Sequence, residues 1–440
     1  MFYLSPDVTL TSPILLDFID KHKTQVSQRY MKLKRAYIGD HEILHTNKKA
    51  SYKPDNRIVV NFPKYIVDTI NGFFIGNPIK IVADDEAVSK YVEYIDQFND
   101  QDDNNAELSK ICSIYGKGYE LYFTDENSML NITYFNPTEA FMIFDDTVLE
   151  NPLYFVRLYK DYDGNELGCL YTKSYYRSFK LTGGFKWLEE EKSHLFTYVP
   201  ATEFIENEER QGVFEDVMSM VNAFNKAISE KANDVDYFAD AYLKVLGTKL
   251  ENDDIQHIRD NRIINFEGDV DTGKLVVDFM NKPESDTTQE NYLNRLERLI
   301  FQISMVANIS DENFGGSSGI ALKYKLQAMS NLEKTKRRKF VSGMNRRYKV
   351  LFSHPLSPVP EDAWIQLHYH FTPNFPANLL EEAQIAAQME GITSHKTQLK
   401  VMSIVDDVQS ELKLIDEENA SQVEKSALDG HFFASQVKED

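Results

Sequence analysis

The stretch from Ser317 to Phe352, SSGIALKYKLQAMSNLEKTKRRKFVSGMNRRYKVLF, decides the architecture of this 440-residue chain. Helix-forming residues dominate it, and no proline occurs between Gly319 and Pro355, so the pattern predicts one long helix. The loop before it, Asp311 to Ser318, contains paired glycines that relax the backbone and serines that can cap a helix. The sequence therefore predicts a long helix that starts from a flexible loop.

This helix is strongly basic, although the whole chain is acidic. The chain has 48 Lys and Arg residues against 69 Asp and Glu residues, and its net charge is −21. Acidic neighbours or phosphate groups must neutralise so many clustered cations. The cations of the helix are Lys323, Lys325, Lys334, Lys336, Arg337, Arg338, Lys339, Arg346, Arg347 and Lys349.

Composition and length limit the classes of protein to which this chain can belong. The apolar fraction of 42% and the aromatic fraction of 12% are typical of a globular chain, with two to four domains or one elaborated domain. A broad polyanion-binding surface is unlikely in so acidic a chain. The two cysteines, Cys112 and Cys169, predict neither a metal site nor a disulfide framework. Without a signal peptide or a long apolar run, we expect a soluble protein made in a cytoplasm.

The first half of the chain mixes helical and strand-like patterns, which predicts an α+β region. An amphipathic helix is expected at 14–37, a second helix across Tyr65 to Phe73, and further helix within 86–115. The expected strands are 79–82, 119–123, 131–135, 140–144, 154–159, 167–173, 175–181 and 194–198.

The second half predicts two helices around a small β-rich insert. A helix over 213–234 would span about 33 Å, and its apolar residues recur at spacings of three and four. The insert has strand patterns at 241–246, 262–266 and 274–279, and Thr287 with Glu290 fits the start of the next helix. A strand at 365–371 and an acidic helical tail follow. The two helices could equally be ordinary core helices of one globule.

Two blocks that lie far apart in the chain carry a recognisable pattern. The first is NFPKYIVDTINGFFIGNPIKI, from Asn61 to Ile81, followed by YGKGYE at 115–120. The second is Ser318 to Phe352, with SGIALKYKL and the cluster KTKRRKF. Together, and in this order, the blocks resemble the bacteriophage portal protein family, in particular the portals of long-tailed phages that infect Gram-positive hosts. The resemblance covers nearly the whole chain.

The resemblance implies an α+β portal-type fold whose parts follow one another along the chain. These parts are an α+β wing (1–212 and 354–376), a two-helix stem (213–235 and 286–307), a small β-rich clip (236–285), a tunnel loop (308–318), a long kinked tunnel helix (319–353) and a helical C-terminal crown (377–440).

The resemblance also implies partners. Copies of the chain would form a ring, a dodecamer in the virion, at one capsid vertex, and double-stranded DNA would pass through it. The large terminase subunit and later a head–tail adaptor would dock on the clip, and major capsid and scaffold proteins would contact the ring. No catalytic activity, cofactor, metal or membrane contact is expected.

Three sets of functional residues follow from the resemblance. The tunnel loop that would face DNA comprises Asp311, Glu312, Asn313, Phe314, Gly315, Gly316, Ser317 and Ser318. The basic cluster of the tunnel helix comprises Lys323, Lys325, Lys334, Lys336, Arg337, Arg338 and Lys339. The stem contacts are Phe214, Val217, Val221, Phe224, Ile228, Leu293, Leu296, Ile300 and Ile303.

For the basic cluster we favour ion pairing over direct contact with DNA. A sliding conduit needs contact without strong retention, and each firm phosphate contact adds affinity. The pairing carboxylates would lie within the chain or, as we prefer, on the next subunit.

An alternative function is that of a soluble intracellular metal-dependent hydrolase. Neighbouring carboxylates can hold Mg²⁺, and four such pairs occur: Asp84–Asp85, Asp145–Asp146, Asp253–Asp254 and Asp406–Asp407. None fits a nuclease pattern, and adjacent surface carboxylates are usually solvated. His368 and His370 have a spacing that can bind a metal, but strand alternation places them simply on a polar face.

Overall fold

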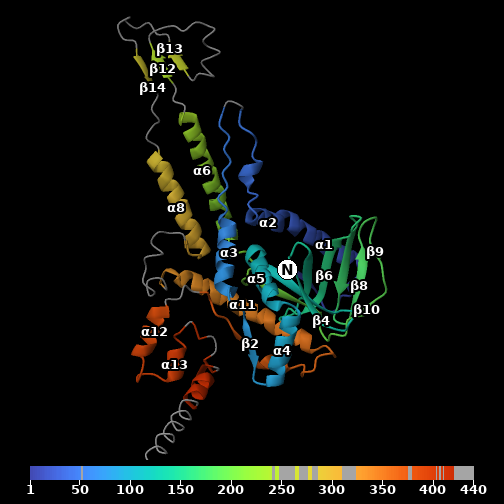
Figure 1. Cartoon of the computed structure of the whole chain (residues 1–440). Coiled ribbons are helices and arrows are strands. Elements are labelled where there is room, and N and C mark those ends of the chain that lie inside the picture. Colours follow the sequence, from blue (N-terminus) through green and yellow to red (C-terminus); the bar gives the residue numbers. More distant parts are fainter. Residues whose placement is uncertain are drawn as a thin grey trace, which may run out of the picture. The chain divides into compact units, whose positions relative to one another are not determined.

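A computed structural model describes residues 1–50, 53–239, 243–246, 263–266, 276–279, 286–309, 324–374, 379–402, 404–405, 408–409 and 411–420 (Figure 1). The chain divides into two compact units. The first comprises Met1–Asn308 and Leu326–Asn374, and the second comprises Ile309–Lys325 and Phe375–Asp440. Among the described residues, no helix combines the length and the apolar character that a membrane span requires.

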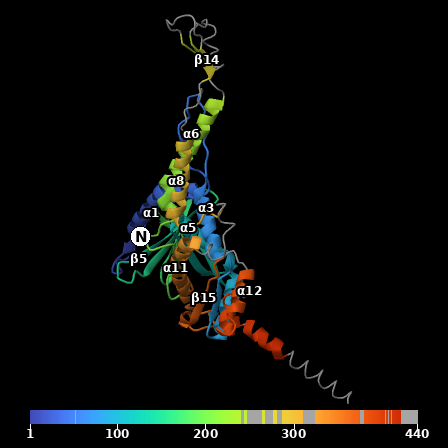
Figure 2. The same ribbon diagram turned by 90° about the vertical axis from the view of Figure 1, so that its left-hand side faces the viewer.

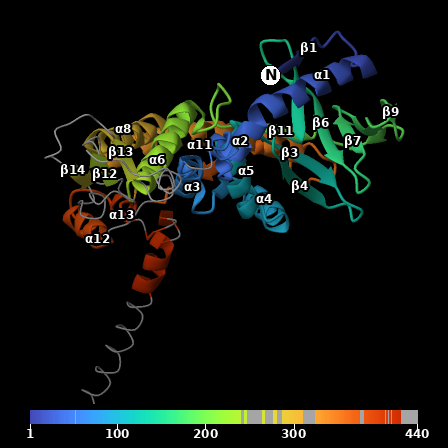
Figure 3. The ribbon, with the colours of Figure 1, turned by 90° about the horizontal axis from the view of Figure 1, so that it is seen from above.

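The first unit contains a seven-stranded sheet with the order β1-β5-β6-β7-β8-β10, in which β9 pairs with β8. Its strands are β1 (Phe2–Leu4), β5 (Ala140–Asp145), β6 (Pro152–Lys160), β7 (Glu166–Tyr171), β8 (Tyr175–Lys180), β9 (Lys186–Trp187) and β10 (Lys192–Ser193). Helix α1 (Ser12–Gln25) lies along this sheet (Figure 3) and buries Leu15, Phe18 and Ile19 against it. A π-helical turn (Val26–Tyr30) joins α1 to α2 (Met31–Tyr37).

A second layer of the first unit surrounds a three-stranded sheet with the order β11-β3-β4. Its elements are α3 (Phe62–Ile75), β2 (Lys80–Ala83), α4 (Glu86–Phe98), α5 (Gln101–Tyr115), β3 (Lys117–Thr124), β4 (Leu130–Phe135), β11 (Ala201–Ile205) and β15 (Leu367–His370). Strands β2 and β15 pair with each other although they lie far apart in the chain. A core of aromatic and aliphatic side chains fills the space between these elements.

Local sequence signals explain where these helices begin and end. The Asn61 side chain accepts a hydrogen bond from the backbone of Lys64 at the start of α3, and Asp85 caps α4 in the same way. Helix α5 ends at Gly116, whose φ is +84°. A Cβ on Gly116 would lie 1.9 Å from the carbonyl oxygen of Arg210, so only glycine fits this crossing of two segments.

The remaining long helices of the first unit are α6 (Met218–Ala239), α8 (Asp286–Ser304) and α11 (Gln327–Phe352). Helices α6 and α8 lie side by side (Figures 1 and 2). Between them in the sequence comes a small sheet with the order β13-β12-β14, made of β12 (Leu243–Leu246), β13 (Ile263–Phe266) and β14 (Val276–Phe279). The predicted helix–β-module–helix succession is therefore present.

The second unit is helical where it is described. It contains α12 (Leu379–Gln388), α13 (His395–Leu399) and helical residues 411–420. The side chain of Ser394 caps α13 by accepting a hydrogen bond from the backbone of Thr397.

Several predicted boundaries need correction. The helix expected from 213 begins only at Met218, because a 3₁₀ turn (Glu215–Val217) precedes it. Residues 194–198 form no regular strand, and β11 lies further along at 201–205. The strand expected at 365–371 is shortened by a 3₁₀ turn (Ala363–Gln366), which leaves Ile365 exposed. The N-terminal strand β1 was not predicted.

Candidate functional site: the basic helix and the helical pair

Helix α11 is the predicted basic helix, and its 26 residues span about 39 Å. Phe340, Met344 and Tyr348 recur every four residues on one face and are almost fully buried. An added Cβ at Gly343 would lie 2.5 Å from the ring of Phe204 on β11. The glycine therefore lets α11 pack closely against β11.

Arg347 and Glu120 form a buried bidentate ion pair between α11 and β3. Arg347 Nε and Nη2 donate to the two carboxylate oxygens of Glu120 at 2.8 and 2.6 Å, and Nη2 also donates to Asn105 at 2.6 Å. Both side chains of the pair are at most 1% exposed. Burial alone would lower the pKa of Arg347, but the Glu120 carboxylate outweighs burial, and the pKa lies above its ordinary value.

A second buried pair joins α11 to the segment after β11. Lys336 Nζ donates to Glu206 Oε2 at 2.5 Å, to Ser113 Oγ at 2.6 Å and to the carbonyl oxygen of Ser109 at 3.1 Å. An ammonium group has three donors, and here each of them has an acceptor. Both side chains of this ion pair are 1% exposed. Lys336 therefore fixes α11 to α5 within the chain.

A third ionic cluster lies on β3 and β11. Glu203 accepts from Lys117 Nζ at 3.2 Å, from Tyr119 Oη at 3.2 Å and from Arg210 Nη2 at 3.0 Å. Burial would raise the pKa of Glu203, but Lys117 and Arg210 outweigh it, and the pKa lies below its usual range. Glu203 is therefore a carboxylate at neutral pH.

Other cations of α11 have mixed environments. Lys339 pairs with Glu208, and Arg337 pairs with Glu333 one turn earlier on the same helix. Lys325 is exposed and precedes α11, which begins at Gln327 after a turn at Leu326 and not at 319 as predicted. Within the described part of the chain, Lys334 and Arg338 have no carboxylate at ion-pair distance.

The prediction of ion pairing for the basic cluster is thus correct for Lys336, Arg337 and Lys339, and it extends to Arg347. Our preference for carboxylates of the next subunit is wrong for these four, because their partners belong to the same chain. For Lys336 and Arg347 the physical reason is burial, because a cation in a core needs its counter-ion in that core. Arg337 and Lys339 are about one-third exposed and pair with carboxylates that the fold places beside them. Lys323 and the predicted tunnel loop, Asp311 to Ser318, lie outside the described residues.

Helices α6 and α8 pack along the predicted apolar seam. Val221 and Phe224 of α6 and Leu293, Leu296 and Ile300 of α8 are buried. Phe214 and Val217 are also buried, but they precede α6, and Ile228 is half-buried. The ring of Phe224 packs edge-on against that of Phe62 at 5.0 Å, which ties the pair to α3.

Ile303 does not belong to this seam, since it is 49% exposed. Helix α8 ends at Ser304, and Ser304 and Val306 take the buried positions there. At the last turn of α8 the residue four positions after Ile300, Ser304, is buried rather than Ile303, three positions after it; the apolar spacing alone does not distinguish these two positions.

A polar stripe on α6, which the sequence analysis missed, anchors an extended segment. Asn225, Ser229 and Asn233 are spaced four apart and therefore share one helix face. Their side chains accept hydrogen bonds from the backbone N–H groups of residues 60, 58 and 56, at 2.8, 2.9 and 2.6 Å. The regular spacing of these three short polar residues was the signal in the sequence that could have indicated a contact with backbone.

In the two described carboxylate pairs, Asp85 and Asp145 each stabilise local structure. Asp85 caps α4, and Asp145 accepts from the backbone and side chains of Thr147 and Asn151 in the turn after β5. Asp253–Asp254 and Asp406–Asp407 lie outside the described residues. On β15, His368 and His370 are exposed, whereas Leu367, the first residue of the strand, is buried against the core. This agrees with the alternation predicted from the sequence.

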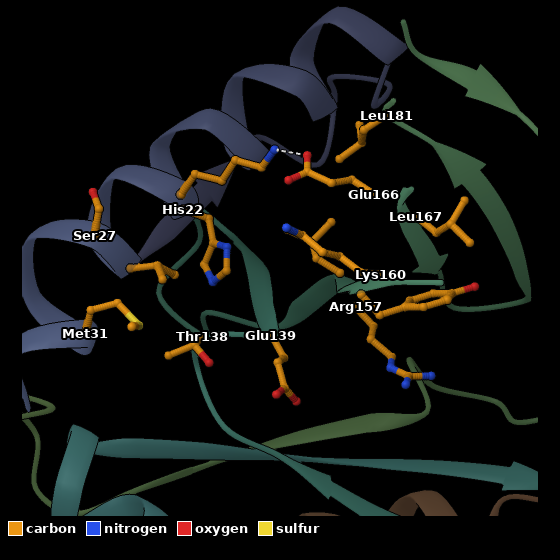
Figure 4. Close-up of a pocket in the computed structure, with 14 residues that line it drawn as sticks. His22, Ser27, Met31, Thr138, Glu139, Arg157, Lys160, Glu166, Leu167 and Leu181 are labelled. Carbon is orange, nitrogen blue, oxygen red and sulfur yellow. Dashed lines mark hydrogen bonds and ion pairs between the residues drawn. The ribbon is translucent and has the colours of Figure 1, made fainter. Parts of the chain in front are cut away.

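One cavity, of about 690 Å³, lies between α1 with its π-helical extension and strands β6 and β7 (Figure 4). His22 points into this region from α1, and its Nε2 contacts the carbonyl oxygen of Pro137 at 2.8 Å. Burial lowers the pKa of His22 to about 4, so its imidazole is neutral at pH 7. Lys23 and Glu166 pair at 2.6 Å beside the cavity. The lining comes from distant segments, so no sequence motif indicated it.

Comparison with known proteins shows which family this chain resembles. The sequence model of the family described as "Phage portal protein, SPP1 Gp6-like" matches residues 16–425. A portal protein of Clostridium phage phiCD119 is 23% identical over 445 residues, covering 92% of this chain and 96% of the relative. A chain from a solved structure titled "Neck of empty GTA particle computed with C6 symmetry" is 11% identical, with 84% and 92% of the two chains covered and a TM-score of 0.47. The match over most of its length shows that this chain belongs to the SPP1 Gp6-like family of phage portal proteins.

Proposed function

We propose that copies of this chain close into a ring at one vertex of a phage capsid and that double-stranded DNA passes through its axis. The observation that carries the proposal is the family match from residue 16 to residue 425, which spans the helical pair, the small β module and the basic helix. The chain would act as a virion component without catalytic activity.

In this proposal, each part of the portal corresponds to elements named above. Helices α6 and α8 would form the stem, and the β12–β14 module would form the clip, the docking surface for the large terminase subunit and then for a head–tail adaptor. The sheets of the first unit would form the wing, next to major capsid and scaffold proteins. Helix α11 would be the tunnel helix, and α12 with α13 would belong to the crown.

Charge supports a conduit that surrounds DNA without holding it. The chain carries a net charge of −21, and four cations of α11 are already neutralised by carboxylates of the same chain. A neutralised lysine or arginine releases few counter-ions from DNA and therefore adds little affinity. A duplex inside such a ring would be centred by repulsion and would remain free to slide.

Negative-stain microscopy with native mass spectrometry of the purified full-length chain tests the ring directly. We expect closed particles with an axial hole and a mass that is a whole multiple of 50.9 kDa. By the resemblance to the portal family, the ring in the virion would contain twelve subunits. A protein that stays monomeric at every concentration and ionic strength would refute the proposal.

Deletion of Asp311 to Ser318 tests the proposed tunnel loop. Because the loop would face DNA rather than a neighbouring subunit, the variant should still form rings but package or retain less DNA in a capsid assembly assay. Loss of the ring itself would instead place this loop in a subunit interface.

The hydrolase alternative makes an opposite prediction. It requires Mg²⁺-dependent turnover by an isolated monomer, whereas the portal proposal predicts a ring without turnover. The described pairs Asp84–Asp85 and Asp145–Asp146 are used for a helix cap and a turn, which favours the portal proposal.

A further inference from the structure

A second cavity, of about 660 Å³, lies where α11 passes over β11 and the turn after β5. Its lining is unusually rich in charge. The cations are Arg210, Arg338, Lys339 and Arg346, and the carboxylates are Glu150, Glu203 and Glu208. All these residues belong to the first compact unit.

The carboxylates of this cavity already have donors. Glu203 is paired with Lys117 and Arg210, and Glu208 is paired with Lys339. Glu150 accepts a hydrogen bond from Tyr3 Oη at 2.9 Å. These contacts use Arg210 and Lys339, so they leave the two other arginines of the cavity uncompensated.

Arg338 and Arg346 have no carboxylate at ion-pair distance within the described part of the chain. Arg338 is exposed, whereas Arg346 is half-buried and makes one long hydrogen bond, from Nε to the carbonyl oxygen of Ala201 at 3.4 Å. Burial lowers the pKa of Arg346, although a guanidinium stays charged under all ordinary conditions. A partly desolvated cation without a counter-ion is unfavourable, so this site is incomplete as it stands.

The two arginines lie eight residues apart on α11, which is about 12 Å along the helix axis. Ser342 and Gly343 lie between them and also line the cavity. Ser342 lies four residues from each arginine, and its short side chain leaves space between the guanidinium groups. A planar carboxylate matches the fork of guanidinium donors and can enter this space from outside.

The charge around the cavity discriminates between anions. The side chains of the lining carry four cations and three carboxylates, so one further carboxylate would balance them, whereas the many phosphates of duplex DNA would exceed that charge. The chain itself, at −21, offers many acidic side chains to a neighbouring copy. An acidic side chain of another copy therefore fits this site better than phosphate of the genome does.

We propose that Arg338 and Arg346 form a socket that receives one or two acidic side chains of the adjacent copy of this chain. This inference rests on the ring put forward under the proposed function. It assigns a subunit contact to the two α11 arginines for which the described residues provide no carboxylate at ion-pair distance, in contrast to the four cations of α11 that are paired internally. The contact would fix the position of α11 relative to the next subunit.

Charge removal provides the first test. Arg338→Gln and Arg346→Gln, singly and together, are compared with Lys334→Gln, which removes an exposed and unpaired cation of the same helix outside the cavity. We expect the double variant to raise the subunit concentration at which rings dissociate by at least about ten-fold. Lys334→Gln should leave it unchanged. Thermal unfolding shows whether each variant is folded. If Arg346→Gln does not fold, Arg338→Gln, at an exposed position, still tests the proposed contact.

Cross-linking identifies the partner. A carbodiimide couples amines to carboxylates but does not couple guanidinium groups, so Arg338→Lys and Arg346→Lys create a reactive amine at each position. We expect mass spectrometry of the cross-linked variants to find a link from the new lysine to an acidic residue of another copy, a link that the wild type, with arginine at that position, cannot form. Links only to Glu150, Glu203 or Glu208 of the same chain, with rings unaffected by the glutamine variants, would overturn the inference.

Two further outcomes remain distinct. A loss of duplex DNA affinity in the double glutamine variant, with rings of unchanged stability, would assign the arginines to DNA and overturn the socket. A wild-type chain that forms no ring would refute the proposed function itself, before any variant is compared.

Discussion

Arg347 and Glu120 form an ion pair that connects α11 to β3 where water has little access. The two side chains are 0% and 1% exposed; Asn105 accepts a hydrogen bond from Arg347, and Tyr122 donates one to Glu120. Such a pair adds little net stability compared with apolar residues, but loss of one partner leaves a buried charge alone. The pair therefore specifies how α11 docks on the sheet.

Glu120→Gln should lower the free energy of unfolding by about 3–5 kcal/mol, because it leaves the Arg347 guanidinium without its counter-ion. Urea denaturation at one fixed protein concentration measures the effect, since assembly alters apparent stability. Combining Glu120→Gln with Arg347→Met, which removes the orphaned charge, should restore part of the loss. A single variant as stable as the wild type would mean that water reaches the pair.

His22 should make the fold sensitive to acid. Burial lowers its pKa to about 4 in the folded chain, against about 6.5 in an unfolded chain. Between these values the unfolded state binds a proton that the folded state does not, so stability present above pH 6.5 is lost as the pH falls towards 4. The loss from this group amounts to about 3 kcal/mol.

His22→Gln removes this titration and can still donate a hydrogen bond to the Pro137 carbonyl oxygen. We expect the difference in unfolding free energy between pH 7 and pH 4.5 to shrink in this variant, as measured by urea denaturation at both values. His395→Gln, at an exposed site, is the matched control and should keep the wild-type difference. An unaltered pH dependence in His22→Gln would show that the imidazole is solvated.

At the scale of elements, the sequence predicted which helices and strands exist, and in what order, more accurately than it predicted their first and last residues. The helical pair, the small β module and the long basic helix were all readable, because each has a strong periodicity or a helix-forming run. The shift of the strand from 194–198 to 201–205 was not readable, since pairing with β3 rather than local pattern selects the register. The ion-pair partners of Lys336 and Arg347 could not be predicted from the sequence for a similar reason, because Glu206 and Glu120 come close to these cations only in the tertiary fold.

The helical pair supplies a test that separates folding from assembly. Ile300 and Ile303 are neighbours on α8, but Ile300 is 0% exposed and Ile303 is 49% exposed. Ile303→Asp should leave the helical content unchanged and weaken the ring, because an exposed apolar residue on a proposed stem helix is placed to meet another subunit.

Ile300→Asp should instead reduce thermal stability, since it places a carboxylate against the buried seam with α6. Circular dichroism and native mass spectrometry on both variants distinguish the two effects. Rings as stable as the wild type with Ile303→Asp would remove this face of α8 from the subunit interface.

At the scale of the whole molecule, net charge and internal pairing together set how the protein meets DNA. The logarithm of duplex affinity falls with the logarithm of salt concentration by about 0.9 for each phosphate that the protein neutralises. A chain of charge −21, in which carboxylates of the same chain pair with four cations of α11, should neutralise few phosphates. We therefore expect weak duplex binding by the assembled ring and a slope no steeper than about −2, measured by fluorescence anisotropy between about 50 and 200 mM NaCl. A slope of about −5 or steeper would mean that many cations reach the backbone, and a ring with that property would grip the genome rather than let it slide.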